Sequence, residues 1–209
     1  MTARFWRRLA GEPARPVEPQ PVVRRDPAFT PHTLDTAPAA ARATMAGVHR
    51  ALGHLPGAVG LMAESPELLN GFLTVNRSYQ SCGLTAVERE VVVLTVATRN
   101  ECHLCVAMHT AILTESGAAP ELISALRAGT RLPDGRLEVL RCFAQAVLDH
   151  QGAVPDAELS AFLAAGYQSR HALDVVLGVG AYTISTFANR LTRAPLDPPV
   201  AQYAWQPAP

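Results

Sequence analysis

Helix start signals recur along this chain, and no strand signal accompanies them. Ser65 followed by Pro66 is typical of an N-cap and a first helical residue. Thr85 with Glu88 three residues later fits a capping box. No stretch alternates convincingly between apolar and polar residues, and no Asn-Gly or Asp-Gly pair lies between strand-like runs. The pattern therefore predicts an all-α fold.

Apolar residues at spacings of three and four, together with start and stop residues, divide the centre of the chain into eight expected helices. Asn100 is a possible N-cap for the fourth helix, and Gly117 is its expected stop. Gly178 and Gly180 in the last helix indicate close helix packing. The expected helices run from 39 to about 53, 65 to about 82, 86 to 99, 100 to about 117, 120 to about 129, 134 to 150, 155 to 165 and 169 to 191.

Prolines separate both ends of the chain from this helical part. Residues 12–38 hold seven prolines, which are too many for a helix and too irregular for a collagen-like repeat. We therefore expect a Pro/Arg-rich arm over 1–38, extended or disordered, a helical domain over 39–194, and a Pro-rich tail without helix over 195–209. Tyr203 and Trp205 of that tail are available to contact a neighbouring molecule.

The charge and length of the chain exclude several classes of function. The chain has 209 residues, 48% of them hydrophobic, which is enough for the core of one domain. Its 18 basic and 18 acidic residues cancel, so no overall field attracts nucleic acid or an anionic membrane. Every basic residue is arginine, which excludes lysine Schiff-base chemistry. The start lacks a secretory pattern and the longest apolar run, 91–97, is too short for a bilayer, so we expect a cytoplasmic protein without a membrane segment.

The segment from Asn100 to His109 carries the residues with most chemistry. On a helix, Cys102, Cys105 and His109 share one face, and the two cysteines lie within reach of a disulfide. The helix start favours the thiolate of Cys102, and His109, one turn after Cys105, can accept the proton of that thiol. Glu90 on the preceding helix can orient the histidine if the two helices pack antiparallel.

In this segment the chain resembles the alkyl hydroperoxidase D (AhpD) and carboxymuconolactone decarboxylase family. Redox-active members carry Glu, eleven residues, and then Cys-x-x-Cys-x-x-x-His, which Glu90, Cys102, Cys105 and His109 match. The resemblance extends from about residue 55 to residue 197 and includes Thr183–Thr192. One departure is Leu104, which stands where the best-known relay has an additional histidine, with His103 one residue earlier.

The resemblance implies an AhpD-like helical bundle and a thiol-dependent peroxidase. It makes Cys105 the peroxidatic cysteine and Cys102 the resolving one, with Glu90 and His109 as the proton relay. It also implies a hydroperoxide substrate, an external dithiol reductant, no cofactor and a homo-oligomer, often trimeric.

Three other interpretations of the residues stay open at this point. The two cysteines with His103 and His109 are possible zinc ligands, although the spacing favours redox chemistry and we expect no metal requirement. The fold also serves carboxymuconolactone decarboxylase-type enzymes, and the cysteine pair could act as a non-enzymatic redox switch. The remaining cysteines, Cys82 and Cys142, are expected to be small core residues.

Overall fold

The computed structural model describes residues 28–207. Within that range the chain forms nine α-helices and one 3₁₀-helix and contains no strand, which confirms the predicted all-α fold. The helices are α2 (Ala39–Leu52), α3 (Gly57–Met62), α4 (Pro66–Gln80), α5 (Ala86–Arg99), α6 (His103–Glu115), α7 (Pro120–Ala128), α8 (Gly135–Asp149), α9 (Asp156–Ala164), α10 (Ser169–Leu191) and the 3₁₀-helix η1 (Pro198–Tyr203).

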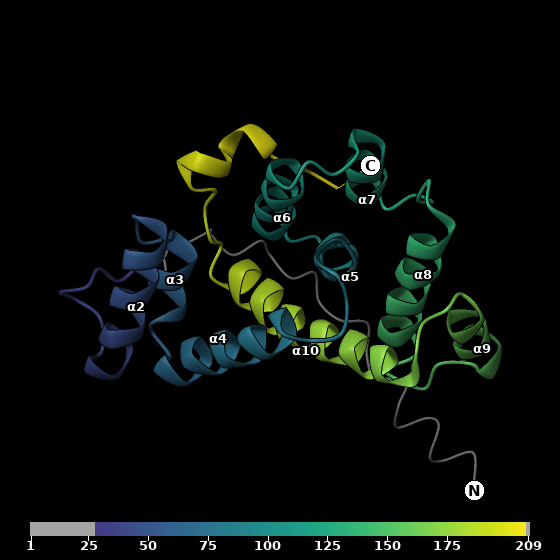
Figure 1. Cartoon of the computed structure of the whole chain (residues 1–209). Coiled ribbons are helices and arrows are strands. Elements are labelled where there is room, and N and C mark those ends of the chain that lie inside the picture. Colours follow the sequence, from purple (N-terminus) through teal and green to yellow (C-terminus); the bar gives the residue numbers. More distant parts are fainter. Residues whose placement is uncertain (1–27, 208–209) are drawn as a thin grey trace, which may run out of the picture.

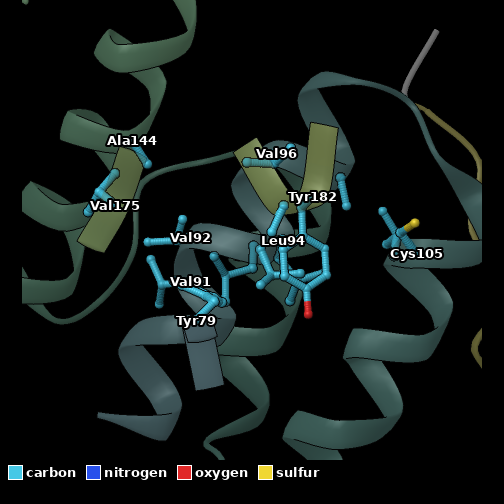
Figure 2. Packing of buried hydrophobic residues seen from close by; sticks show 14 of the residues in the cluster. Tyr79, Val91, Val92, Leu94, Val96, Cys105, Ala144, Val175 and Tyr182 are labelled. Atoms are coloured by element: carbon cyan, nitrogen blue, oxygen red, sulfur yellow. The ribbon is translucent and has the colours of Figure 1, made fainter. Parts of the chain in front are cut away.

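Helix α5 lies at the centre of the molecule, with α6, α7, α8 and α10 packed around it (Figure 1). Every residue from Val91 to Ala97 is buried. Figure 2 shows several of these side chains among Tyr79, Ala144, Val175 and Tyr182, which come from α4, α8 and α10. Full burial of one valine or leucine side chain contributes roughly 1.5–3 kcal/mol, so this stretch fixes α5 firmly inside the bundle.

The predicted capping residues are confirmed at two helix starts. The Thr85 hydroxyl accepts a hydrogen bond from Glu88 N (3.3 Å), and the Glu88 carboxylate accepts one from Thr85 N (2.7 Å). The Ser65 hydroxyl accepts a hydrogen bond from Leu68 N (3.2 Å). Each bond satisfies an amide that the helix itself leaves unpaired.

The predicted cap of α6 is wrong. Asn100 ends α5 instead, because Glu101 takes a left-handed conformation (φ 50°) that closes the helix. Cys102 N then donates to Ala97 O (2.9 Å) and Glu101 N to Thr98 O (3.0 Å), the two bonds of a Schellman motif. Cys102 is therefore the N-cap of α6.

The tail also differs from the prediction. A 3₁₀-helix runs from Pro198 to Tyr203, and the tail binds its own chain. Arg127 of α7 donates to Tyr203 O (3.0 Å) and to Ala204 O (2.9 Å), while the Trp205 indole donates to Arg127 O (2.8 Å). Proline sets the backbone angles of a first helical residue and needs no amide partner there, which is why Pro198 and Pro199 can begin this helix.

The described part of the N-terminal arm, residues 28–38, contains no α-helix and lies against α3. His32 N donates to Gly60 O (3.0 Å), and the His32 ring bonds the Glu64 carboxylate (2.8 Å). Residues 1–27 of the expected arm lie outside the described residues. Helix α3, which the sequence patterns did not predict, is only six residues long.

The expectation that Cys142 is a core residue is wrong, and Cys82 lies only at the edge of the core. Cys142 is exposed and donates to the Glu138 carboxylate (3.3 Å), and Cys82 is half-buried just after α4. Cys82 packs against the main hydrophobic core from its edge, whereas Cys142 lies next to the charged side chains of Glu138 and Arg141.

Helix α10 combines a buried face with an exposed apolar one. By length and composition it is the one helix in residues 28–207 that could cross a membrane, and core helices share those properties. One side packs on α4, α5 and α8, while Leu173, Phe187 and Leu191 are exposed. The homo-oligomer implied by the family resemblance stays a prediction, and this exposed apolar face is one surface that such a contact could bury.

The two glycines of α10 provide a test of helix packing. A Cβ at Gly178 would lie 2.6 Å from the Tyr79 ring, whereas a Cβ at Gly180 would meet nothing within 4 Å. Gly178→Ala should lower the free energy of unfolding by about 1–3 kcal/mol through overpacking. Gly180→Ala should raise it by about 0.5–1 kcal/mol, because alanine restricts the unfolded chain. Urea unfolding followed by circular dichroism measures both, and equal effects of the two variants would contradict the packing described.

Candidate functional site

Glu90 and His109 form a buried pair between two consecutive helices. The imidazole Nδ1 lies 2.6 Å from Glu90 Oε2, and only 7% of Glu90 and 6% of His109 is exposed. The His109 ring also packs edge-on against Tyr182, with 5.0 Å between ring centroids. Removal from water strengthens this hydrogen bond and fixes the orientation of the ring.

The two cysteines face each other at the start of α6. Cys102 Sγ accepts a hydrogen bond from Cys105 N (3.4 Å), and the two sulfur atoms lie 2.9 Å apart as free thiols. Cys102 is 1% and Cys105 2% exposed. A short movement of either side chain would allow a disulfide, and the backbone separation of an N-cap and the third residue of its helix suits such a bond.

The environments of the two thiols differ. The hydrogen bond between the two thiols lowers the pKa of Cys102 to about 7, and backbone amides of Cys105 and Leu104 act in the same direction against burial. The hydrogen bond to Cys102, together with burial, raises the pKa of Cys105 well above its usual value. The first proton lost by the pair therefore leaves a thiolate on Cys102.

Helix α10 supplies two polar side chains that the sequence patterns did not identify. Asn189 Nδ2 donates to Cys105 Sγ (3.3 Å), and Ser185 Oγ lies 3.8 Å from the same sulfur. Both are buried, and they stand one turn apart on the helix. The available signal was their spacing of four on the helix, which places two polar groups on one face.

A cavity of about 400 Å³ opens beside this cluster. Cys105, Glu90, His109, Ser185 and Asn189 all line it, whereas Cys102 does not. Most of the other lining side chains are apolar and come from α2, α3, α4 and α6: Val48, Leu52, Ala58, Val59, Met62, Leu69, Phe72, Leu73, Met108 and Ile112. A molecule in the cavity would thus reach Cys105, with Cys102 behind it.

The structure brings Glu90, Cys102, Cys105 and His109 together, but no hydrogen bond joins the Glu90–His109 pair to the cysteine pair within the described residues. Among the residues it describes, His109 forms no hydrogen bond with Cys105, so a proton can pass between them only through water or a bound molecule. Leu104, which replaces the additional relay histidine, is fully buried in the core. Over residues 28–207, no three His, Cys, Asp or Glu side chains converge as metal ligands.

Comparison with known proteins matches the centre of the chain to a family. The model of the carboxymuconolactone decarboxylase family matches residues 63–147, which span α4 to α8 and contain all four predicted site residues. Helices α2, α3 and α10, which supply much of the cavity, lie outside the match. No match was found among curated protein sequences.

Solved structures resemble the chain over most of its length. An uncharacterized peroxidase-related protein with an alkylhydroperoxidase AhpD core, from Ralstonia eutropha JMP134, is 22% identical, with 82% of this chain and 93% of that one covered and a TM-score of 0.72. A peroxidase-related protein from Silicibacter sp. TM1040 is 20% identical, with 86% and 97% covered and a TM-score of 0.70. The debrominase Bmp8, in complex with 2,3,4-tribromopyrrole, is 13% identical, with 85% and 96% covered and a TM-score of 0.67. These similarities show an AhpD-like fold.

The difference in pKa between the two thiols predicts how thiolate formation depends on pH. Thiolate absorbance at 240 nm should rise as the pH increases through about 7, because the lowered pKa of Cys102 keeps its thiolate above that pH. Cys102→Ala should abolish this step, and Cys105→Ala should move it to higher pH by removing the thiol that hydrogen-bonds to Cys102. The matched control is Cys142→Ala, since partial desolvation and the hydrogen bond to the Glu138 carboxylate raise the pKa of Cys142 away from this range. Persistence of the step in Cys102→Ala would contradict the assignment.

Proposed function

Residues 63–147 match the model of the carboxymuconolactone decarboxylase family, and from that premise we propose that the chain is a thiol-dependent peroxidase acting on organic hydroperoxides. The observation that carries the proposal is the position of Cys105. Its sulfur lies at the wall of an apolar cavity, 2.9 Å from a second thiol, and the Glu90–His109 pair lines the same cavity. The apolar lining favours a hydroperoxide with a hydrocarbon body.

The first step transfers one oxygen atom to Cys105. The Cys102 thiolate takes the proton of the adjacent Cys105 thiol, which leaves the Cys105 thiolate facing the cavity. That thiolate attacks the terminal oxygen of the hydroperoxide, so that an S–O bond forms and the O–O bond breaks. The leaving alkoxide takes a proton from His109, whose positive form Glu90 stabilises. The products are a Cys105 sulfenic acid and an alcohol.

The second step closes a disulfide. Cys102 loses its proton to the relay and attacks the sulfur of the Cys105 sulfenic acid, whose hydroxyl leaves as water. The sum is two thiols and one hydroperoxide giving one disulfide, one alcohol and one water. An external dithiol then reduces the disulfide by thiol–disulfide exchange and restores the pair.

The division of roles between the cysteines is testable with single variants. Cys105→Ser should abolish hydroperoxide consumption, because the cavity then holds no thiol. Cys102→Ser should still allow one oxidation and leave a sulfenic acid at Cys105 that a sulfenate-specific reagent traps. Single-turnover kinetics with peptide mass mapping measures both. Labelling of Cys102 in the Cys105→Ser protein at the wild-type rate would reverse the roles, and full activity in both variants would refute the proposed function.

The relay residues belong to the same experiment. Glu90→Gln and His109→Ala should slow the first oxidation by about 10²- to 10⁴-fold, the usual contribution of a general acid or base. Both variants should keep the helical circular dichroism spectrum of the wild type. Unchanged rates would show that neither side chain takes part in proton transfer.

A further inference from the structure

One buried oxygen beside Cys105 lacks a hydrogen bond. Asn189 is only 4% exposed, and its Nδ2 donates to Cys105 Sγ (3.3 Å) and to Ser185 Oγ (3.5 Å). Its Oδ1 is the single buried side-chain polar atom without a partner in residues 28–207. Buried acceptors are nearly always paired, so an unpaired one on a residue that lines the cavity points to a ligand that donates a hydrogen.

We propose that Asn189 is a catalytic residue that holds the terminal oxygen of the hydroperoxide at Cys105, its Oδ1 accepting the O–H hydrogen while its Nδ2 binds the sulfur. This inference rests on the proposed function. It adds a residue of α10, outside the family match, to the residues that touch the reacting atoms.

The chemistry of a hydroperoxide suits this amide. The molecule has one hydrogen-bond donor, the hydrogen on its terminal oxygen, and that oxygen is the atom which a thiolate attacks. An acceptor beside the sulfur therefore selects the reactive end of the substrate and leaves the hydrocarbon body toward the apolar lining. The amide N–H simultaneously favours the thiolate form of Cys105.

The hydrogen bond can persist through the oxygen transfer. As the S–O bond forms and the O–O bond breaks, the hydrogen stays on the transferred oxygen, which becomes the hydroxyl of the Cys105 sulfenic acid. The alkoxide receives its proton from His109. Asn189 thus loses no partner and neither gains nor loses a proton.

A second asparagine in the same cavity offers a matched comparison. Asn76 Oδ1 already accepts a hydrogen bond from the Tyr182 hydroxyl (3.1 Å), and burial raises the pKa of that phenol, which keeps its proton. The Asn76 oxygen therefore already has a hydrogen-bond donor, and a hydrogen bond from a ligand would stabilise binding less there.

The test separates hydrogen-bond recognition from redox chemistry. Reduced protein is titrated with cumyl alcohol, which keeps the O–H donor, and with cumyl methyl ether, which lacks it, and binding is followed by ligand-observed NMR. The wild type should bind the alcohol roughly tenfold or more tightly than the ether, because the ether leaves the buried Oδ1 unpaired. Asn189→Leu should bring this ratio near one, and Asn76→Leu should preserve it.

A second variant covers a folding failure of Asn189→Leu. Asn189→Asp keeps an acceptor of the same shape but removes the N–H donor to Cys105. It should retain the preference for the alcohol and form the Cys105 sulfenic acid from cumene hydroperoxide at least tenfold more slowly, since a carboxylate beside sulfur opposes the thiolate.

The outcomes distinguish the two proposals. Equal binding of alcohol and ether by the wild type overturns the role of Asn189, even if hydroperoxide is consumed. A preference that disappears in Asn189→Leu, without any hydroperoxide consumption by the wild type, supports the O–H site and refutes the peroxidase function. Sulfenic acid formation at the wild-type rate in Asn189→Asp also overturns the proposed contact with sulfur.

Discussion

The burial of the middle of α5 is the constraint on which the rest of the structure depends. Seven successive residues, 91–97, are withdrawn from water, and a helical stretch that is buried all round must be covered on every side. Helices α6, α7, α8 and α10 supply that cover and thereby fix both ends of α5. Its second turn places Glu90 at the cavity. Its last turn passes into the left-handed Glu101, which sets Cys102 at the start of α6.

That arrangement divides between two thiols a low pKa and access to the cavity, which a single thiol would have to combine. Cys102 receives the backbone amide of Cys105 and the lower pKa, but it lies away from the cavity. Cys105 has access to the cavity but is buried and needs help to ionise. The short distance between the sulfurs couples them, so the pair can hold a thiolate near neutral pH and present it where a hydroperoxide would bind.

Local signals predicted most of the fold, and long-range contacts explain what they missed. Thr85 and Glu88, three residues apart, pair each other's free backbone amides, so the start of α5 could be predicted. The pairing of Glu90 with His109 was predicted from a family pattern. The N-cap of α6 could not be predicted in this way. Glu101, whose left-handed conformation ends α5, is not a glycine, and its conformation depends on tertiary packing. Asn189 reaches Cys105 across 84 positions of sequence, and Trp205 reaches Arg127 across 78. No local pattern encodes such contacts.

The most direct test of this account is the stoichiometry of a single oxidation. Fully reduced protein would be mixed with cumene hydroperoxide in the absence of reductant, with thiols and cumyl alcohol counted and the non-reduced peptides mapped by mass spectrometry. We expect two thiols lost and one alcohol formed for each hydroperoxide, with a disulfide between Cys102 and Cys105 and with Cys82 and Cys142 still reduced. A bond between Cys82 and Cys142 with both motif thiols free, or alcohol formed without loss of thiols, would contradict the account.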